Sequence, residues 1–401
     1  MISSLALLAV LAQTQQDPYL AQARALHAKY PLIDGHNDLP GVVRRRSDGD
    51  FVKLDLRKTV EGAQTDVARI RAGGLGGQFW SVYVPTSLSG PEAVKQTLNQ
   101  IELVHRMIET YPDVFQAAYT ADDVERAFKA GKVASMFGME GGHSIDGSLE
   151  TLRAMYRAGA RYMTLTHNRN TPWADSCTDT PAHGGLSPFG EQVVLEMNRL
   201  GMLVDLSHVS PDTMRDALRV SRAPVIYSHS GAHGVCNHPR NVPDDVLPLV
   251  KQNNGVVMVV VLDSFTSQAV YDHDRARTAA QDEARRAFGT DTARVEQAMR
   301  EWDASHKAPV ATLSQVADHI DHIMRRIGID HVGIGADFDG GGGVQGLEDV
   351  SKYPMLTAEL LRRGYTEDDV AKILGLNVLR VMRAAERTSW IMKREALDSG
   401  P

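Results

Sequence analysis

His36 and Asp38 are the residues of this chain whose types and spacing point most directly to chemistry. They end the apolar run that begins at Pro31, and residues two apart in a strand point to the same side. At the end of a strand, this spacing places an imidazole nitrogen beside a carboxylate oxygen, and a divalent metal such as zinc accepts both as ligands. A single pair of this kind also fits a solvated strand end, so further ligands are needed to predict a metal site.

Similar polar residues end other apolar runs of the sequence. They are Glu140, His167, His208, His229 and Asp337. Any one of these histidines alone is more typical of a hydrogen-bonded loop or core residue. Here, however, four runs end in histidine, and three runs end in an acid (Asp38, Glu140 or Asp337). Together these side chains predict a cup-shaped group of metal ligands that is large enough for two ions. Glu140 is the natural bridge, because each of its carboxylate oxygens can bind one ion.

Two metal ions in such a cup would make the site hydrolytic. Ions about 3.5–4 Å apart polarise a carbonyl group and lower the pKa of a bound water, and the resulting hydroxide attacks an amide or ester carbon. We expect Asp337 to take the proton of this water and pass it to the leaving amine. His167 would donate to the oxyanion that develops on the carbonyl oxygen. Asp339, two residues after Asp337, is the alternative proton carrier.

Arg240 is a candidate for binding the substrate. It lies in a turn-rich stretch that follows the sixth predicted strand by about a dozen residues. Its planar guanidinium group could hold a substrate carboxylate through two parallel hydrogen bonds. Pairing of Arg240 with Asp244 or Asp245 at the start of a helix is an equally good interpretation of these residues.

The elements that would position these side chains alternate along the chain. Predicted strands are residues 32–35, 77–84, 133–139, 162–165, 202–206, 225–227, 256–262 and 331–335. Predicted helices are residues 91–111, 121–130 (capped by Thr120), 149–158, 188–200, 212–220, 244–252, 313–327 and 367–387. This alternation predicts a parallel sheet with helices outside it. About eight such units predict an α/β fold of the (β/α)₈ TIM-barrel type, with a binuclear metal site at the C-terminal rim.

One metallohydrolase barrel domain is expected over residues 30–390. Residues 1–12 are predicted to be a signal peptide, residues 13–29 an N-terminal extension and residues 391–401 a tail. The charged, alanine-rich segment 271–309 is predicted to be a helical insertion after the seventh strand, where it could act as a lid or an oligomer contact.

Composition and charge limit the binding partners and the cellular compartment that can be expected for this chain. The formal net charge of −7 gives no basic surface for nucleic acid, so we expect none as a partner. The predicted signal peptide implies export, to a bacterial periplasm; if it is not a signal, the chain stays cytoplasmic. No other run reaches membrane length, so we expect no transmembrane segment in the mature chain. Cys177 and Cys236 are too few for a disulfide framework, and whether they are bridged stays open.

Taken together, the motifs resemble those of the membrane (renal) dipeptidases, which are zinc-dependent members of the amidohydrolase superfamily. The matching segments are residues 34–38, 138–142, 165–168, 171–173, 205–208, 228–230, 240–245, 335–340 and 346–354. They span most of the chain, and their combination is far more specific than any single motif. Residues 259–265 lack the aromatic-rich pattern of the animal members, and the insertion follows there, so substrate preference stays open.

The resemblance implies a ligand set for two zinc ions per chain. His36 and Asp38 would bind one ion, His208 and His229 would bind the other, and Glu140 would bridge both.

The resemblance also implies a substrate and an assembly. His167 would contact the scissile carbonyl group, Arg240 would hold the C-terminal carboxylate of a dipeptide, and Asp337 would carry the proton. The implied activity is hydrolysis of dipeptides, with tolerance of a D-residue on the C-terminal side, by an enzyme that forms a homodimer. The alternatives are an N-acyl amino acid deacylase or lactam hydrolase with the same binuclear site, and a zinc-binding receptor or scaffold without activity. Because every expected catalytic position is occupied, the inactive alternative is the weakest.

Overall fold

The apolar runs of the sequence form parallel strands that close into a barrel. The computed structural model describes residues 17–398, and within them the strands are β1 (Leu32–Asn37), β2 (Leu75–Ser81), β3 (Phe115–Ala117), β4 (Val133–Glu140), β5 (Ala160–Thr164), β6 (Leu203–Asp205), β7 (Ile226–Tyr227), β8 (Val256–Val259) and β9 (Val332–Ile334). Strands β1, β2, β4, β5, β6, β7, β8 and β9 form the ring, since β2 pairs with β1 and β4 while β9 pairs with β1 and β8. The predicted (β/α)₈ fold is confirmed.

Each of the eight predicted strands corresponds to a strand of the ring. The additional strand, β3, pairs with the beginning of β4 through Phe115 and Val133. Its three residues are too few to show an alternating pattern in the sequence, so it was not predicted.

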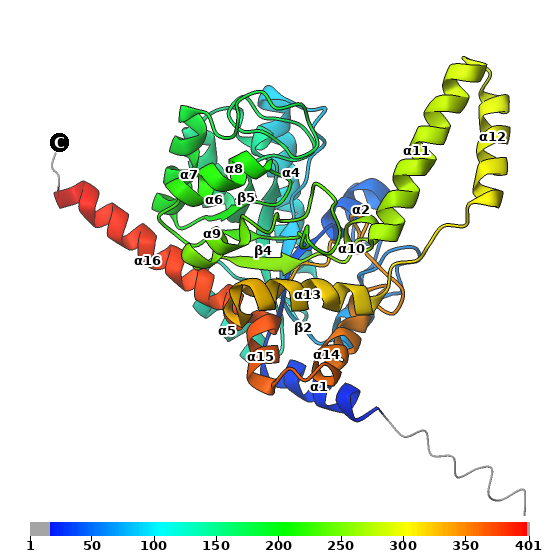
Figure 1. Ribbon diagram of the computed structural model, residues 1–401. Helices are drawn as coiled ribbons and strands as arrows, with labels where there is room; N and C mark the ends of the chain where they lie inside the picture. Colours follow the sequence, from blue (N-terminus) through cyan, green and yellow to red (C-terminus); the bar gives the residue numbers. More distant parts are fainter. Residues whose placement is uncertain (1–16, 399–401) are drawn as a thin grey trace, which may run out of the picture.

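Helices alternate with the strands and surround the barrel (Figure 1). They are α1 (Pro18–Lys29), α2 (Leu39–Ser47), α3 (Val67–Gly73), α4 (Gly90–Thr110), α5 (Ala121–Lys129), α6 (Leu149–Ala158), α7 (Pro188–Leu200), α8 (Pro211–Val220), α9 (Leu247–Gln252), α10 (Asp263–Thr266), α11 (Gln268–Phe288), α12 (Thr292–Ser305), α13 (Leu313–Ile327), α14 (Tyr353–Arg362), α15 (Glu367–Ala371) and α16 (Asn377–Asp398). Thr120 caps α5 as predicted, because its side chain accepts from the backbone N–H of Asp123.

The last helix differs from its prediction. The structure divides it into α15 and α16, joined by a π-helical turn at Lys372–Leu376. Helix α16 continues to Asp398, so residues 391–398, which we expected in a tail, are helical. No glycine or proline interrupts residues 377–398, and this explains why the helix does not end earlier.

The segment after β8 forms two long helices that project from the barrel. Helices α11 and α12 lie side by side as an arm (Figure 1), and Arg277 forms an ion pair with Asp303 between them at 2.8 Å. Most residues of this arm are exposed. The arm occupies the region in which the sequence predicts a helical insertion.

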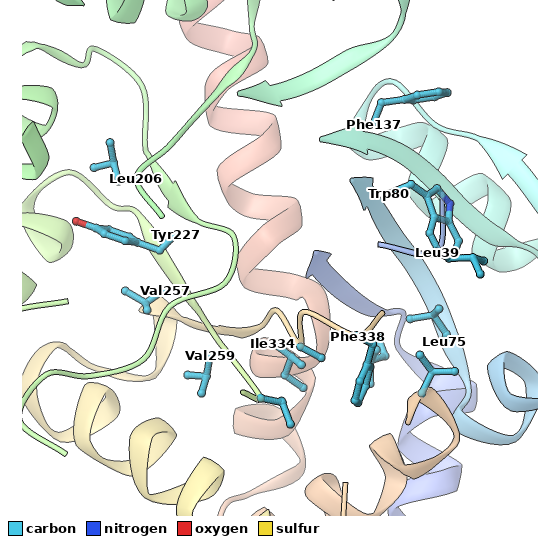
Figure 2. Close-up of a cluster of buried hydrophobic side chains, with 14 of the residues drawn as sticks. Leu39, Leu75, Trp80, Phe137, Leu206, Tyr227, Val257, Val259, Ile334 and Phe338 are labelled. Atoms are coloured by element: carbon cyan, nitrogen blue, oxygen red, sulfur yellow. The ribbon is translucent and has the colours of Figure 1, made fainter. Parts of the chain in front are cut away.

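Two clusters of buried side chains hold the barrel and its helices together. The larger cluster includes Trp80 of β2 and Val257 of β8 (Figure 2). The second joins strand residues to the start of α16, whose Asn377 donates hydrogen bonds to the carbonyl groups of Ile329 and Val332. Since Val332 begins β9, this contact places α16 at the N-terminal end of the barrel and leaves the opposite rim open.

The sequence also raised the questions of a transmembrane helix, a signal peptide and a disulfide bond. Among the described residues, no helix has both the length and the apolar character needed to cross a bilayer. The predicted signal peptide, residues 1–12, lies outside the described residues. Cys177 and Cys236 are both free thiols, so the structure contains no bridge between them.

Candidate active site

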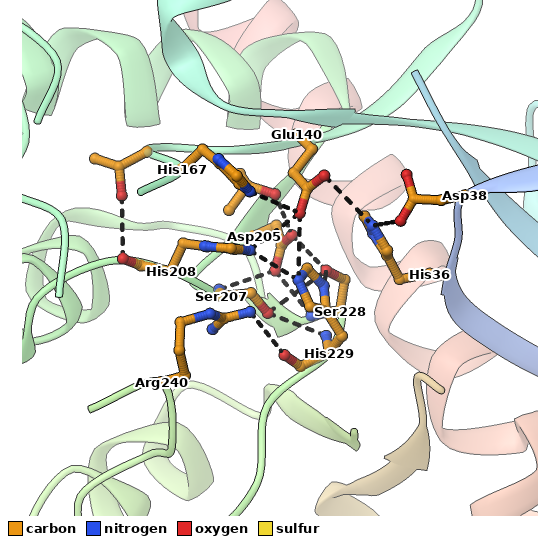
Figure 3. A network of polar contacts seen from close by, with 12 residues as sticks. His36, Asp38, Glu140, His167, Asp205, Ser207, His208, Ser228, His229 and Arg240 are labelled. Atoms are coloured by element: carbon orange, nitrogen blue, oxygen red, sulfur yellow. Dashed lines mark hydrogen bonds and ion pairs between the residues drawn. The ribbon is translucent and has the colours of Figure 1, made fainter. Parts of the chain in front are cut away.

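The predicted metal ligands converge at the C-terminal rim of the barrel (Figure 3). His36 lies near the end of β1, Asp38 follows this strand, and Glu140 is the last residue of β4. His208 and His229 follow β6 and β7. All five side chains are buried, and they meet because the ends of neighbouring parallel strands lie at the same edge.

Glu140 lies between two sets of these side chains. Its Oε1 atom is 3.0 Å from Nε2 of His208 and 3.4 Å from Nε2 of His229. Its other oxygen, Oε2, is 3.5 Å from Nε2 of His36, and that nitrogen lies 3.3 Å from Oδ2 of Asp38. Each carboxylate oxygen therefore faces a different pair of predicted ligands.

The electrostatics of Glu140 suit a bridging position. Burial opposes its ionisation, but the surrounding histidines outweigh this effect and hold the pKa of Glu140 well below its usual range. The carboxylate form, which is the form that binds metal, is therefore the stable one.

The histidines fit a metal pair. Nε2 of His208 and Nε2 of His229 face each other at 3.0 Å, and burial lowers the pKa of both rings, which keeps them neutral. Neutral imidazoles are the form that coordinates metal. Nε2 of His36 is buried without a hydrogen-bond partner among the described residues. One cation could be a common partner for Nε2 of His208 and Nε2 of His229, and a second cation could be one for Nε2 of His36 and Oδ2 of Asp38.

His229 is oriented by a chain of hydrogen bonds behind it. The hydroxyl of Ser228 donates to Oδ2 of Asp205 at 2.6 Å, and its oxygen lies 2.8 Å from Nδ1 of His229. Because the hydroxyl has one proton and gives it to Asp205, it accepts from the Nδ1–H group of His229. The ring is thus held as the tautomer whose Nε2 lone pair faces the site.

His36 has an equivalent support from across the barrel. The Tyr162 hydroxyl lies 3.2 Å from the carbonyl oxygen of Gly35 and 2.8 Å from Nδ1 of His36. Donation to this carbonyl leaves the Tyr162 oxygen to accept from the Nδ1–H group of His36. Gly138 permits this contact, because a Cβ atom there would overlap the Tyr162 ring.

Neither support was predicted from the sequence. Asp205 and Ser228 lie within the family-like segments 205–208 and 228–230, but their pairing with His229 depends on the juxtaposition of β6 and β7. Tyr162 is 126 residues from its partner, and the sequence carries no signal that pairs them.

Removing the hydroxyl of Ser228 is expected to weaken zinc binding. The Ser228→Ala variant leaves Nδ1–H of His229 without its acceptor, and loss of such a contact typically costs ten- to a hundredfold in metal affinity. Competition with a chromogenic chelator measures this affinity. The matched control is Ser135→Ala, because Ser135 of β4 is also fully buried and its hydroxyl donates to the carbonyl oxygen of Val133, away from the metal ligands. Equal zinc affinity in both variants would contradict the orienting role of Ser228.

His167 also faces Glu140. Its Nε2 atom is 3.6 Å from Oε1 of Glu140, and its ring packs against the rings of His208 and Tyr83. Burial lowers the pKa of His167, so the ring is neutral at pH 7. One ligand atom from each of His167, Glu140 and His208 could contact one cation, so the geometry allows either a ligand or a hydrogen-bond donor at this position.

Asp337 reaches the site from the loop after β9. Its carboxylate forms a compact group with His36 and Asp38, in which one ligand atom from each residue lies within 4.8 Å of the others. Burial, reinforced by the nearby carboxylates of Asp38 and Glu140, raises the pKa of Asp337 well above its ordinary value. Its φ of 62° lies in the left-handed region, where a non-glycine residue is strained and a functional constraint is common.

Asp339 is engaged by the loop around Gln64. Its Oδ1 atom accepts from the backbone N–H of Gln64 at 2.7 Å, and its own N–H donates to Oε1 of Gln64 at 2.7 Å. This reciprocal pair gives Asp339 a role in holding the loop that carries Asp337.

Arg240 is a buried cation beside the metal ligands. It donates from Nη2 to the carbonyl oxygen of His229 at 3.2 Å, and its guanidinium group lies over the ring of Phe265. The alternative that Arg240 pairs with a nearby acid is wrong: Asp244 instead pairs with Arg326, and Asp245 pairs with Arg215. No acidic partner binds Arg240 among residues 17–398, so the site has a buried positive charge available for an anionic ligand.

A cavity of about 650 Å³ opens at this site, and the predicted ligands Asp38, Glu140 and His208 line it. Its lining includes His167, Arg240 and Asp337 from the predicted site. It also includes Arg45 and Tyr83, which the sequence did not identify as site residues.

The comparisons with known proteins agree with this geometry. A family model described as membrane dipeptidase (peptidase family M19) matches residues 20–395. Dipeptidase verJ of Clonostachys rogersoniana is 41% identical over 389 residues, which covers 94% of this chain and 90% of that protein. Dipeptidase 3 of Mus musculus is 41% identical over 378 residues, which covers 92% of this chain and 68% of that protein.

The fold of this chain is also similar to that of a protein whose structure has been solved. The probable dipeptidase PvdM from Pseudomonas aeruginosa superposes with a TM-score of 0.80 at 26% identity, and the match covers 93% of this chain and 100% of that one. The resemblance that the sequence motifs indicated is therefore confirmed, and the chain belongs to the membrane dipeptidase family, peptidase family M19.

Proposed function

We propose that this dipeptidase hydrolyses the peptide bond of dipeptides with two zinc ions held at the rim of the barrel. His36 and Asp38 would hold one ion, His208 and His229 would hold the other, and Glu140 would bind both. The observation that carries this proposal is the position of Glu140, whose two oxygens face the two ligand pairs separately. When bound, the ions polarise the scissile carbonyl group and acidify the attacking water.

The surrounding side chains would move the proton and stabilise the developing charge. Asp337 accepts the proton that water loses as its oxygen bonds to the carbonyl carbon. Asp337 then gives this proton to the amine nitrogen as the C–N bond breaks. His167, whose ring lies 12% exposed at the edge of the cup, donates a hydrogen bond to the oxyanion.

Arg240 would make the enzyme specific for a free C-terminal carboxylate. A dipeptide whose scissile carbonyl lies at Glu140 carries its carboxylate only one residue away, and Arg240 supplies a buried guanidinium group next to His229. In a longer peptide, the next residue would occupy the place of this carboxylate and leave the cation unpaired.

Substitution of Arg240 should reveal this preference. Hydrogen bonds to charged groups contribute enough that Arg240→Gln is expected to lower kcat/KM for Gly-Ala by about ten- to a hundredfold, mainly through KM. Gly-Ala amide, which lacks the carboxylate, should be a poor substrate of the wild-type enzyme, and the substitution should change its kcat/KM by about threefold or less. Equal losses for both substrates would contradict the proposed carboxylate contact.

Stereochemistry, export and assembly remain predictions. The family resemblance implies tolerance of a D-residue at the C-terminal position, which hydrolysis of Gly-D-Ala would test. The signal peptide and the homodimer are likewise predictions from the sequence and from the resemblance.

A further inference from the structure

Arg45 differs from the two arginines beside it. Arg44 and Arg46 form hydrogen bonds within the protein. Arg44 donates to the side chain of Gln100, and Arg46 donates to the carbonyl oxygen of Gly62. Across residues 17–398, Arg45 has neither a hydrogen bond nor an ion pair, and it lines the cavity of the active site instead. This unpaired positive charge at the cavity is not used in the proposed reaction.

The geometry of α2 brings Arg45 toward the metal ligands. Asp38, Gly41 and Arg45 are spaced three and four residues apart and so share one face of this helix. Helix side chains lean toward the N-terminus, which points Arg45 back over Gly41 toward Asp38. A Cβ atom on Gly41 would lie 3.0 Å from Nη1 of Arg45, so glycine provides the space in which the guanidinium group lies.

In the proposed reaction, Arg45 and Arg240 would face opposite ends of a bound substrate. In Figure 3, Asp38 and Arg240 lie on opposite sides of Glu140. If Arg240 holds the C-terminal carboxylate and the scissile carbonyl lies at Glu140, the N-terminal residue of the dipeptide extends toward Asp38 and α2. Its side chain would then approach Arg45.

We propose that Arg45 binds an anionic side chain on the N-terminal residue, so that the preferred substrates are dipeptides that begin with aspartate or glutamate. This inference rests on the proposed function, because the direction of the substrate follows from the carboxylate contact of Arg240. A guanidinium group binds a carboxylate through charge-assisted hydrogen bonds, and a neutral amide of the same shape provides only part of that interaction. Arg45 is exposed to solvent, so the preference should be moderate.

The test compares two substrates that differ only in charge. We expect kcat/KM for L-Glu-L-Ala to exceed that for L-Gln-L-Ala by about three- to tenfold in the zinc-loaded enzyme, and we expect this ratio to fall as the salt concentration rises. In Arg45→Gln the ratio should approach one. In Arg45→Glu the preference should reverse, so that L-Lys-L-Ala becomes a better substrate than L-Glu-L-Ala.

The control is Arg46→Gln, which changes the net charge equally but removes a side chain bound to the 61–62 loop. It should keep the wild-type ratio. If the wild-type enzyme cleaves L-Glu-L-Ala and L-Gln-L-Ala with equal kcat/KM, the role of Arg45 is wrong although the dipeptidase activity stands. The same holds if Arg45→Gln and Arg46→Gln change the ratio of these two kcat/KM values equally. Failure to cleave these dipeptides and Gly-Ala would instead overturn the proposed function, and this inference with it.

Discussion

Replacing Asp337 with asparagine is expected to lower kcat by about two to four orders of magnitude while the metal ions remain bound. A positioned general acid–base contributes this much to a rate, and an amide can neither accept the proton of water nor return it to the amine. The carboxylate of Asp337 is buried in the same compact group as His36 and Asp38, which places it beside the proposed reacting water. Single-turnover hydrolysis of Gly-Ala, with zinc content determined on the same sample, measures both quantities.

The zinc content of the Asp337→Asn variant shows whether Asp337 is a proton carrier or a metal ligand. Its carboxylate lies close enough to His36 and Asp38 to be a ligand itself, and loss of zinc from Asp337→Asn would show that it is one. Asp339→Asn is the matched control, since asparagine keeps an Oδ1 acceptor for the backbone N–H of Gln64. Activity that disappears in Asp339→Asn and persists in Asp337→Asn would reverse the assignment.

Replacing Glu140 with glutamine is expected to remove at least one zinc ion and to abolish hydrolysis. The amide NH₂ group cannot coordinate a metal, so one of the two ligand pairs, either His36 with Asp38 or His208 with His229, loses its shared carboxylate. Loss of a ligand should weaken zinc retention by more than the ten- to hundredfold that is typical for a contact behind a ligand. Zinc per chain after dialysis, together with kcat, measures the effect.

The folded state of this variant must be established separately. Circular dichroism and a thermal unfolding curve in the presence of zinc show whether Glu140→Gln keeps the barrel. A folded variant that retains two zinc ions per chain would contradict the bridging role of Glu140.

The fold and the convergence of the candidate ligands could be predicted because both have local causes. Each barrel strand is a short apolar run, and the rule that chemistry lies at the C-terminal rim brings the polar residues after these runs into one place. His36, Glu140 and His229 could thus be grouped even though they are far apart in the sequence.

Contacts that depend on the packing of distant segments could not be predicted. The acids next to Arg240 in the sequence were plausible partners, but in the fold Asp244 faces His322 and Arg326 from α13. Likewise, the direction of Arg45 follows from how α2 lies against the rim, which no local pattern specifies.

The measurement that tests the central claim most directly is hydrolysis of Gly-L-Ala and Gly-D-Ala by the purified protein, with zinc per chain determined before and after treatment with a chelator. We predict about two zinc ions per chain, and cleavage that disappears with the metal and returns when zinc is restored. Two bound ions without cleavage would contradict the dipeptidase activity and direct attention to N-acyl amino acids and lactams. A folded protein that binds no metal and cannot be reconstituted would contradict the metal site itself.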